Sequence, residues 1–93
     1  MSYELEFAKS ANREWKKLGA NVRAQFSKKL IQRLNAPHVP AALIDRSKHR
    51  YKIKLRASGF RLVYEVHDDR LVVVVIAVGK RNRGDVYDKA KMR

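Results

Sequence analysis

The sequence predicts a single α/β domain of the α+β kind, in which an N-terminal strand and a two-helix hairpin pack on a small, mainly antiparallel sheet that is followed by a short C-terminal helix. Three observations predict this fold class. The hydrophobic period is helical in the first half and alternates in the second, two prolines separate the halves, and turn signals recur after residue 50. With 93 residues, the chain is expected to form one domain, residues 1–93.

The first half of the chain is expected to contain one strand and two helices. Residues 3–7 alternate as in a strand, and a first helix is marked by apolar residues at helical spacing before Gly19: Ala8, Ala11, Trp15 and Leu18. A second helix is predicted over about residues 22–34, with Asn21 as its N-cap. Its apolar stripe is Val22, Phe26, Leu30, Ile31 and Leu34. The opposite, basic face is predicted to be Arg23, Lys28, Lys29 and Arg33.

The second half of the chain is expected to contain three strands. Pro37 and Pro40 end the second helix, and residues 41–49 have no clear period, so we expect a loop there. Strands follow from residue 50, with turns at residues 58–59 and 68–69 and a last strand at residues 71–78. That last strand is apolar in both phases, as expected for a strand covered on both sides. A short helix is expected from about residue 85.

A two-residue turn at residues 58–59 predicts the register of the first hairpin. It would pair Arg56 with Arg61 and Lys54 with Val63. A three-residue turn would mix apolar and charged side chains on each face, so the two-residue turn is the predicted one.

The charge of the chain points to a polyanionic partner. There are 22 Lys and Arg residues against 9 Asp and Glu residues, which gives a formal net charge of +13 and a pI near 10.5. Nucleic acid, including a ribosome surface, is the leading candidate, followed by an acidic protein and then an anionic membrane. The chain has no cysteine and no signal-like start, which suits the cytoplasm, and its longest apolar run is too short to span a bilayer.

Residues 50–56 concentrate this charge on one side of a predicted strand. Tyr51, Ile53 and Leu55 fall in one phase and the basic residues in the other, so successive side chains would separate core from charge. Like charges on one face repel each other and do not help folding. We therefore predict that this face binds phosphate. The residues expected to contact RNA here and near the last strand are Arg50, Arg56, Lys80 and Arg83.

The residue types favour one kind of chemistry over the standard catalytic constellations. The sequence has no glycine-rich phosphate loop and no cysteine nucleophile, its histidines lack metal-ligand spacing, and we expect neither a metal nor a cofactor. RNA supplies its own nucleophile, the 2′-hydroxyl, so the protein needs a base, an acid and cations for the charge on phosphorus. Lys52, Lys54 and Arg61 are predicted to form the cationic cradle. Tyr87 is predicted to be the base and Arg81 to stabilise the leaving oxygen. From these residues alone, binding without cleavage remains an alternative.

Several segments together resemble the RelE-like toxins of bacterial type II toxin–antitoxin systems. They are Tyr51-Lys-Ile-Lys-Leu-Arg56, Ser58-Gly-Phe-Arg-Leu-Val-Tyr64, Val78-Gly-Lys-Arg81, Val86-Tyr87 and, in the first half, Glu14-Trp-Lys-Lys-Leu-Gly19. The likeness covers nearly the whole chain with matching spacing.

This resemblance implies a ribosome-dependent endoribonuclease that cuts mRNA in the ribosomal A site and arrests translation. In that family, Lys52, Lys54 and Arg61 neutralise phosphate, Tyr87 or Lys54 is the base, and Arg81 is the acid. The resemblance also implies a cognate RelB-like antitoxin that wraps the toxin and can displace its C-terminal helix, the 70S ribosome as a partner, and operator DNA bound only through the antitoxin complex. A gyrase-inhibiting toxin of the related ParE-like branch and a non-catalytic RNA- or ribosome-binding protein are the alternatives.

Overall fold

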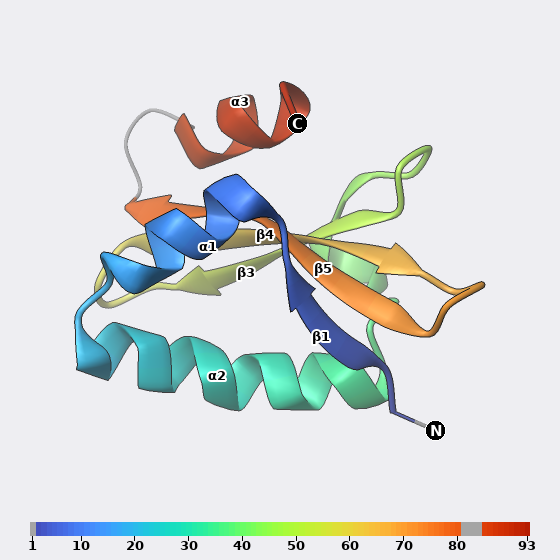
Figure 1. The fold of residues 1–93 in the computed structure, drawn as a ribbon, viewed down its shortest axis with the longest axis horizontal. Helices are drawn as coiled ribbons and strands as arrows, with labels where there is room; N and C mark the ends of the chain where they lie inside the picture. The colour runs from blue at the N-terminus through green and yellow to red at the C-terminus, as the bar shows by residue number, and fades with distance from the viewer. Residues whose placement is uncertain (1, 81–84) are drawn as a thin grey trace.

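The computed structural model describes residues 2–80 and 85–93, and it contains a five-stranded sheet with three α-helices. In chain order the elements are β1 (Glu4–Phe7), α1 (Lys9–Lys16), α2 (Ala20–Asn35), the 3-10 turn η1 (Pro40–Ala42), β2 (Leu43–Asp45), β3 (Arg50–Leu55), β4 (Phe60–His67), β5 (Val72–Lys80) and α3 (Asp85–Lys91). Figure 1 shows this arrangement along the chain. The predicted fold class is confirmed. Within the described residues, no helix is both long enough and apolar enough to cross a bilayer.

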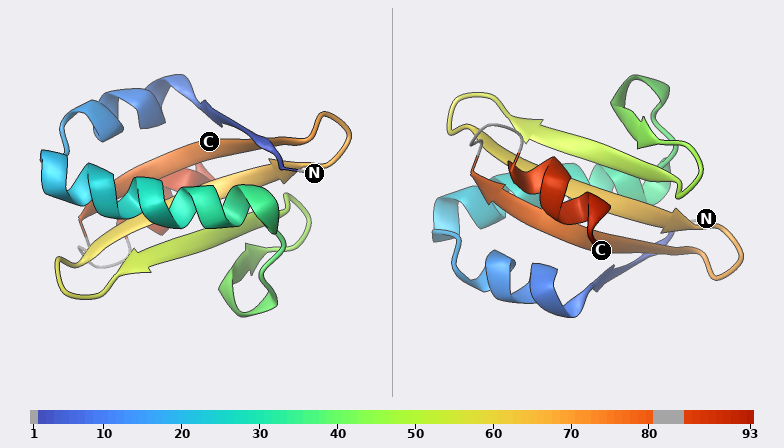
Figure 2. Two further views of the ribbon diagram at one scale, coloured as in Figure 1. Left: turned by 90° about the horizontal axis from the view of Figure 1, so that it is seen from below. Right: turned by 90° about the horizontal axis from the view of Figure 1, so that it is seen from above.

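The sheet has the strand order β1-β5-β4-β3-β2, and only the β1–β5 pair is parallel. Helix α2 lies along one face and α3 crosses the other, as the two views of Figure 2 show from opposite sides. The inner strand β5, between β1 and β4, is thus covered on both faces, which is why it is apolar in both phases. Strand β2 lies in the segment that was predicted to be a loop, so that prediction was wrong.

The main core lies between the sheet and α2. Phe26 and Leu30 of α2 are almost fully buried against Leu62, Tyr64 and other residues of the sheet. Val22 and Leu34 of the predicted stripe also pack against this core, whereas Ile31 is 63% exposed, so the prediction was wrong for Ile31 alone. The predicted N-cap was also wrong, because α2 begins at Ala20 with Gly19 as its cap.

A smaller core lies under α3 on the opposite face of the sheet. Val86 and Ala90 of α3 pack against Val63 of β4 and against Ile76 and Ala77 of β5. A break in the β4–β5 register places Val63 opposite Ala77 and Tyr64 opposite Val75, so Ile76 is an extra residue in β5. The bulge explains why two consecutive side chains of β5 belong to the cluster under α3.

The β3–β4 hairpin has a longer turn than predicted. Lys54 pairs with Arg61 and Leu55 with Phe60, so the connection is four residues long, not two. Gly59 closes it with a φ of 77°, a left-handed conformation that suits glycine, and its N–H donates to the carbonyl of Leu55 at 2.8 Å. The predicted register was therefore shifted along the hairpin by an even step, so each residue kept its predicted face.

Helix α1 continues along the edge of β5 beyond the end of β1. The parallel pairing of β1 ends at Phe7 opposite Val75. Further along β5, the N–H of Val78 donates instead to Oε1 of Glu14 in α1, at 3.2 Å. The side chain of Glu14 thus supplies a hydrogen-bond acceptor to β5 beyond the end of β1.

Candidate functional site

Three cations gather on the face of the sheet that α3 covers in part. Lys52 and Lys54 alternate along β3 with the buried Ile53 and Leu55, and Arg61 of β4 lies directly opposite Lys54. Paired residues share a face, so the three charged side chains project on the same side as Val63, the residue opposite Lys52. The predicted gathering of these cations is confirmed, although the pairing partners differ from the prediction.

The neighbouring cations lower the pKa of Lys54. The pKa of Lys54 is lowered, first by the positive charge of Lys52, then by burial and by the charges of Arg61 and Arg56. Across residues 2–80 and 85–93, neither lysine nor Arg61 lies within ion-pair distance of a carboxylate. Among the same described residues, Arg61 donates only to the neighbouring carbonyl of Phe60, at 3.2 Å. The cluster thus carries uncompensated charge that attracts a polyanion.

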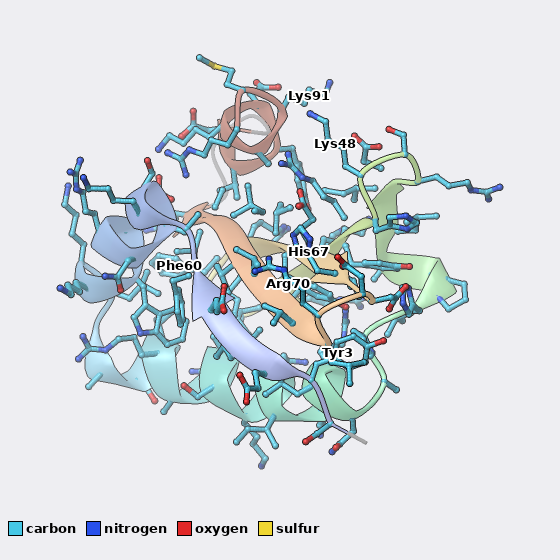
Figure 3. All side chains as sticks on the ribbon, turned by 45° about the vertical axis from the view of Figure 1, so that its right-hand side comes forward. Tyr3, Lys48, Phe60, His67, Arg70 and Lys91 are labelled. Atoms are coloured by element: carbon cyan, nitrogen blue, oxygen red, sulfur yellow. The ribbon has the colours of Figure 1, made fainter. Side chains whose placement is uncertain are left out.

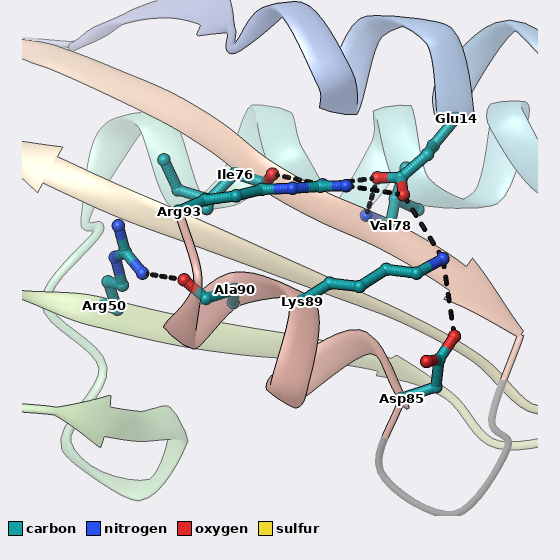
Figure 4. Close-up of polar contacts among 8 residues, drawn as sticks. All are labelled: Glu14, Arg50, Ile76, Val78, Asp85, Lys89, Ala90 and Arg93. Atoms are coloured by element: carbon teal, nitrogen blue, oxygen red, sulfur yellow. Dashed lines mark hydrogen bonds and ion pairs between the residues drawn. The ribbon is translucent and has the colours of Figure 1, made fainter.

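Arg50 does not belong to this exposed face, because its side chain is buried, so the structure does not favour its predicted role as an RNA contact. Its side chain is only 6% exposed, and its Nε donates to Oε2 of Glu65 at 2.8 Å. A second guanidinium nitrogen donates to the carbonyl of Ala90 in α3 (Figure 4). Arg50 has the expected strand phase, but α3 covers this end of the face and Glu65 neutralises the charge.

Tyr87 lies on the same side of the sheet as the lysines, because α3 packs on Val63. Its ring is half-buried, and its hydroxyl oxygen is buried without a hydrogen-bond partner in the described part of the chain. Tyr87 lines a cavity of about 190 Å³ together with Arg50 and residues of β2 and α3. Lys52 and Lys54 line a different groove. Tyr87 therefore lies on the same side of the sheet as the lysines but lines a different cavity.

The remaining predicted site residues are dispersed. Arg56 is exposed in the hairpin turn and is close enough to Lys54 to lower its pKa. Lys80 is exposed at the end of β5, but it pairs with Phe60 and so has the phase opposite to that of Arg61. Arg81 and Arg83 lie outside the described residues.

Helix α3 is fastened by one carboxylate that sequence reasoning did not single out. Glu14 accepts a hydrogen bond from Arg93 at 2.9 Å and lies 3.5 Å from the ammonium of Lys89. Arg93 also donates to the carbonyl of Ile76, and Figure 4 shows these contacts together. Burial opposes ionisation of Glu14, but these hydrogen bonds and charges, together with the N–H of Val78, outweigh it and lower its pKa. A signal was present, because Glu14 is the only acidic residue between Phe7 and Asp45.

A series of hydrogen-bonded polar side chains lies beside Tyr51, near the start of β3. The Nε2–H of His38 donates to Oδ1 of Asp68 at 2.8 Å, and its Nδ1 lies 2.8 Å from the hydroxyl of Tyr51. Tyr3 donates to the same Asp68 oxygen at 2.6 Å. The hydrogen bonds from Tyr3 and His38 lower the pKa of Asp68, so the carboxylate is charged at neutral pH. This series connects β3 with the β4–β5 turn and is structural.

Side chains from separate segments add to the positive charge on the α3 side of the sheet. Figure 3 shows Lys91 of α3 and Lys48 of the β2–β3 turn projecting on the same side of the molecule. Both are exposed. The positive surface therefore extends beyond the three clustered cations.

Comparisons with known proteins show likeness over the whole chain. The family model described as the ParE toxin of the type II toxin–antitoxin system parDE matches residues 5–84. The mRNA interferase toxin RelE of Escherichia coli strain K12 is 50% identical over 93 residues, which cover 100% of this chain and 98% of the relative.

Solved structures show the same likeness. A doubly substituted E. coli toxin RelE in the free state matches with a TM-score of 0.90 and 47% identity, covering 100% of this chain and 98% of the other. A chain of the intact E. coli RelBE toxin–antitoxin complex matches with a TM-score of 0.83 and 49% identity, covering 88% and 100%.

Proposed function

This chain belongs to the RelE/ParE family of type II toxin–antitoxin toxins, and from this premise we propose that it is a ribosome-dependent mRNA endoribonuclease, which cuts messenger RNA in the ribosomal A site and so inhibits translation. The relatives' name, mRNA interferase, supports action on messenger RNA. Such an activity belongs in the cytoplasm, where translating ribosomes are found.

The observation that carries this proposal is the uncompensated cluster of Lys52, Lys54 and Arg61 on the side of the sheet where Tyr87 also lies. Attack by a 2′-hydroxyl on the adjacent phosphate builds negative charge on the phosphoryl oxygens. Three cations on one face are suited to stabilise that charge. No metal is needed for this role, because the ammonium and guanidinium groups supply the positive charge.

The base in this proposal is Tyr87 or Lys54. The lowered pKa of Lys54 increases the fraction of neutral amine, the form that accepts a proton. Tyr87 offers a phenol oxygen that is buried and has no partner among the described residues, and a buried polar atom of this kind calls for an explanation. Arg81, in the segment that the structure does not describe, is the proposed acid.

The arrangement also supports dependence on the ribosome. Tyr87 lines one cavity and the lysine pair another, so the free chain does not offer all the proposed groups to one phosphate. A messenger fixed by the ribosome would supply the missing alignment, and such positioning contributes greatly to catalytic rate. We therefore expect slow cleavage of free RNA.

We propose a RelB-like antitoxin as the controlling partner. The match to a chain of the RelBE complex supports this assignment, and a net charge of +13 favours an acidic partner. Binding to operator DNA would occur through the antitoxin complex. No membrane partner is proposed.

A gyrase-inhibiting toxin is the second candidate, because the matching family model is described as the ParE toxin. The 50% identity to RelE over the full chain favours the nuclease. A non-catalytic RNA-binding protein would share the cationic face but would leave messenger intact.

Addition of the protein to a translating extract, followed by primer extension on the messenger, tests the proposal. We expect new 5′ ends at A-site codons. Intact messenger with translation continuing would contradict the nuclease, and intact messenger with inhibited DNA supercoiling by gyrase would select the second candidate.

Tyr87→Phe tests the proposed base. We expect ribosome-dependent cleavage to slow by about a hundredfold or more, because only the ionisable oxygen is lost. Folding should be unaffected, since that oxygen has no partner in the described chain. Tyr3→Phe is the matched control, because it removes a phenol oxygen that bonds Asp68 far from the cations. Equal single-turnover rates for the wild type and Tyr87→Phe would exclude Tyr87 as the base.

A further inference from the structure

A second cationic feature lies where α2 faces the outer edge of β3. A groove of about 290 Å³ is lined by five cations and three small apolar residues, all within the described chain, and no carboxylate is among them. The cations come from two elements and the hairpin turn: Lys29, Arg33, Lys52, Lys54 and Arg56. Two of them, Lys52 and Lys54, also belong to the proposed cleavage site.

Arg33 is positioned in this groove by contacts to the sheet, although the sequence predicted it on a solvated face. Its NH1 donates to the hydroxyl of Tyr64 at 2.8 Å and to the carbonyl of Lys52 at 3.2 Å, with its guanidinium carbon 5.6 Å from the Tyr64 ring centre. The Tyr64 hydroxyl in turn donates to the carbonyl of Pro37 at 2.7 Å. Arginine has five N–H donors, so this fixed side chain has further donors for a ligand.

The edge of β3 at this groove lacks a strand partner. Strand β2 pairs with β3 only at Arg50 and Tyr51, so residues 52–55 have no neighbouring strand on that side in the described chain. The carbonyl of Lys52 points outward there, because it accepts from Arg33. On a strand, the N–H and C=O of one residue point to the same side, and residues two apart share that side, so the N–H of Lys54 also faces the groove. A backbone donor thus joins the cations.

We propose that this groove binds a second phosphodiester of a single RNA strand, so that the strand bound at Lys52 and Lys54 continues round the edge of β3 to Lys29 and Arg33. The inference rests on the proposed function, which it extends by assigning the RNA path. Lys52 and Lys54 project on the α3 side of the sheet, whereas Lys29 and Arg33 come from α2 on the other side. A single strand can bend round such an edge, whereas a rigid duplex cannot follow it.

The test measures the salt dependence of RNA binding. The probe is a fluorescein-labelled 12-nucleotide single strand with 2′-O-methyl groups, which cannot be cleaved, and anisotropy titrations are run from low to high salt. Each substitution that removes a phosphate-binding cation should reduce the slope of log affinity against log salt by about 0.7. The affinity at 0.1 M salt should fall by about fivefold for each such cation. The single variant Lys29→Ala should remove one such cation. The double variant, which combines Lys29→Ala with Arg56→Ala, should remove two.

Lys28→Ala is the matched control. Lys28 is an exposed lysine next to Lys29 on α2, but it does not line the groove, so its slope should equal that of the wild type. Arg33 is left unchanged, because its contacts to Tyr64 also support the fold. An unchanged slope in the double variant, or an equal reduction in the Lys28 variant, would overturn the proposal.

Two further measurements distinguish a failure of this proposal from a failure of the proposed function. A hairpin duplex of the same length should bind without sensitivity to Lys29→Ala, and a reduction confined to the duplex would overturn the single-strand path. Cleavage of ribosome-bound messenger by the wild type with an unchanged slope in the double variant would overturn the groove but leave the nuclease intact. A reduced slope without any cleavage would support the groove and contradict the nuclease.

Discussion

Replacing Arg50 by alanine should destabilise the protein without weakening its contact with RNA. The sequence predicts Arg50 as an RNA-binding residue, whereas the structure shows it buried between Glu65 and the carbonyl of Ala90. These two interpretations predict opposite results for the same variant. The experiment therefore decides what this arginine does.

The expected loss of stability follows from the surroundings of Glu65. Removing one partner of a buried ion pair costs about 3–5 kcal/mol, because the other charge remains buried and unpaired. Here the carboxylate of Glu65 is 19% exposed and keeps His67, whose Nε2 lies 2.7 Å away. We therefore expect Arg50→Ala to lower the free energy of unfolding by about 2–3 kcal/mol, below the full penalty.

Urea unfolding followed by the fluorescence of Trp15, the single tryptophan, measures this change in stability. With a slope near 1 kcal/mol per molar urea, the midpoint should fall by about 2–3 M. Arg46→Ala is the control, because Arg46 is an exposed arginine nearby and should change stability by less than about 0.5 kcal/mol. A change in Arg50→Ala no larger than in this control would refute the structural role.

The same variant should bind the 12-nucleotide RNA with an unchanged salt slope. If the slope instead fell by about 0.7, Arg50 would contact a phosphate and the interpretation from the sequence would be right.

Two further predictions concern Glu14 and Gly59. Burial opposes the charge of Glu14, but its hydrogen bonds lower its folded-state pKa below the ordinary 4.5, so its stabilisation is complete above that pH and is lost as the pH falls through the folded-state pKa. Glu14→Gln should therefore unfold in less urea at pH 7 and lose less stability between pH 7 and pH 3 than the wild type; parallel pH profiles would contradict this. Gly59→Ala should cost about 1–2 kcal/mol, because the φ of Gly59 is 77°, whereas Gly19→Ala should cost less, since φ at this N-cap is −64° and an added Cβ there meets nothing within 4 Å. Equal melting temperatures for the two glycine variants would exclude backbone strain at Gly59.

The order of the longer elements could be predicted because each is long enough to show its hydrophobic period in the sequence. The face of Arg61 was predicted correctly despite the wrong turn length, since turns of two and four residues preserve the same phase. Strand β2 was missed because three residues are too few to show a period.

Contacts between distant segments were beyond sequence reasoning. The burial of Arg50 depends on where α3 packs, and the inward turn of Arg33 depends on a partner, Tyr64, that lies 31 positions away. Phase gives the side of a strand on which a side chain lies. It does not say what covers that side.

The extra residue in β5, Ile76, changes which positions of the strand face each of the two cores. Before it, Val73 and Val75 supply the core under α2, and after it Val78 does so, which means that odd and even positions exchange roles at Ile76. Insertion or deletion of one residue at Ile76 would therefore change the surface on which α3 packs and leave the main core under α2 intact. Alignments of relatives should accordingly place their gaps at this point of the strand.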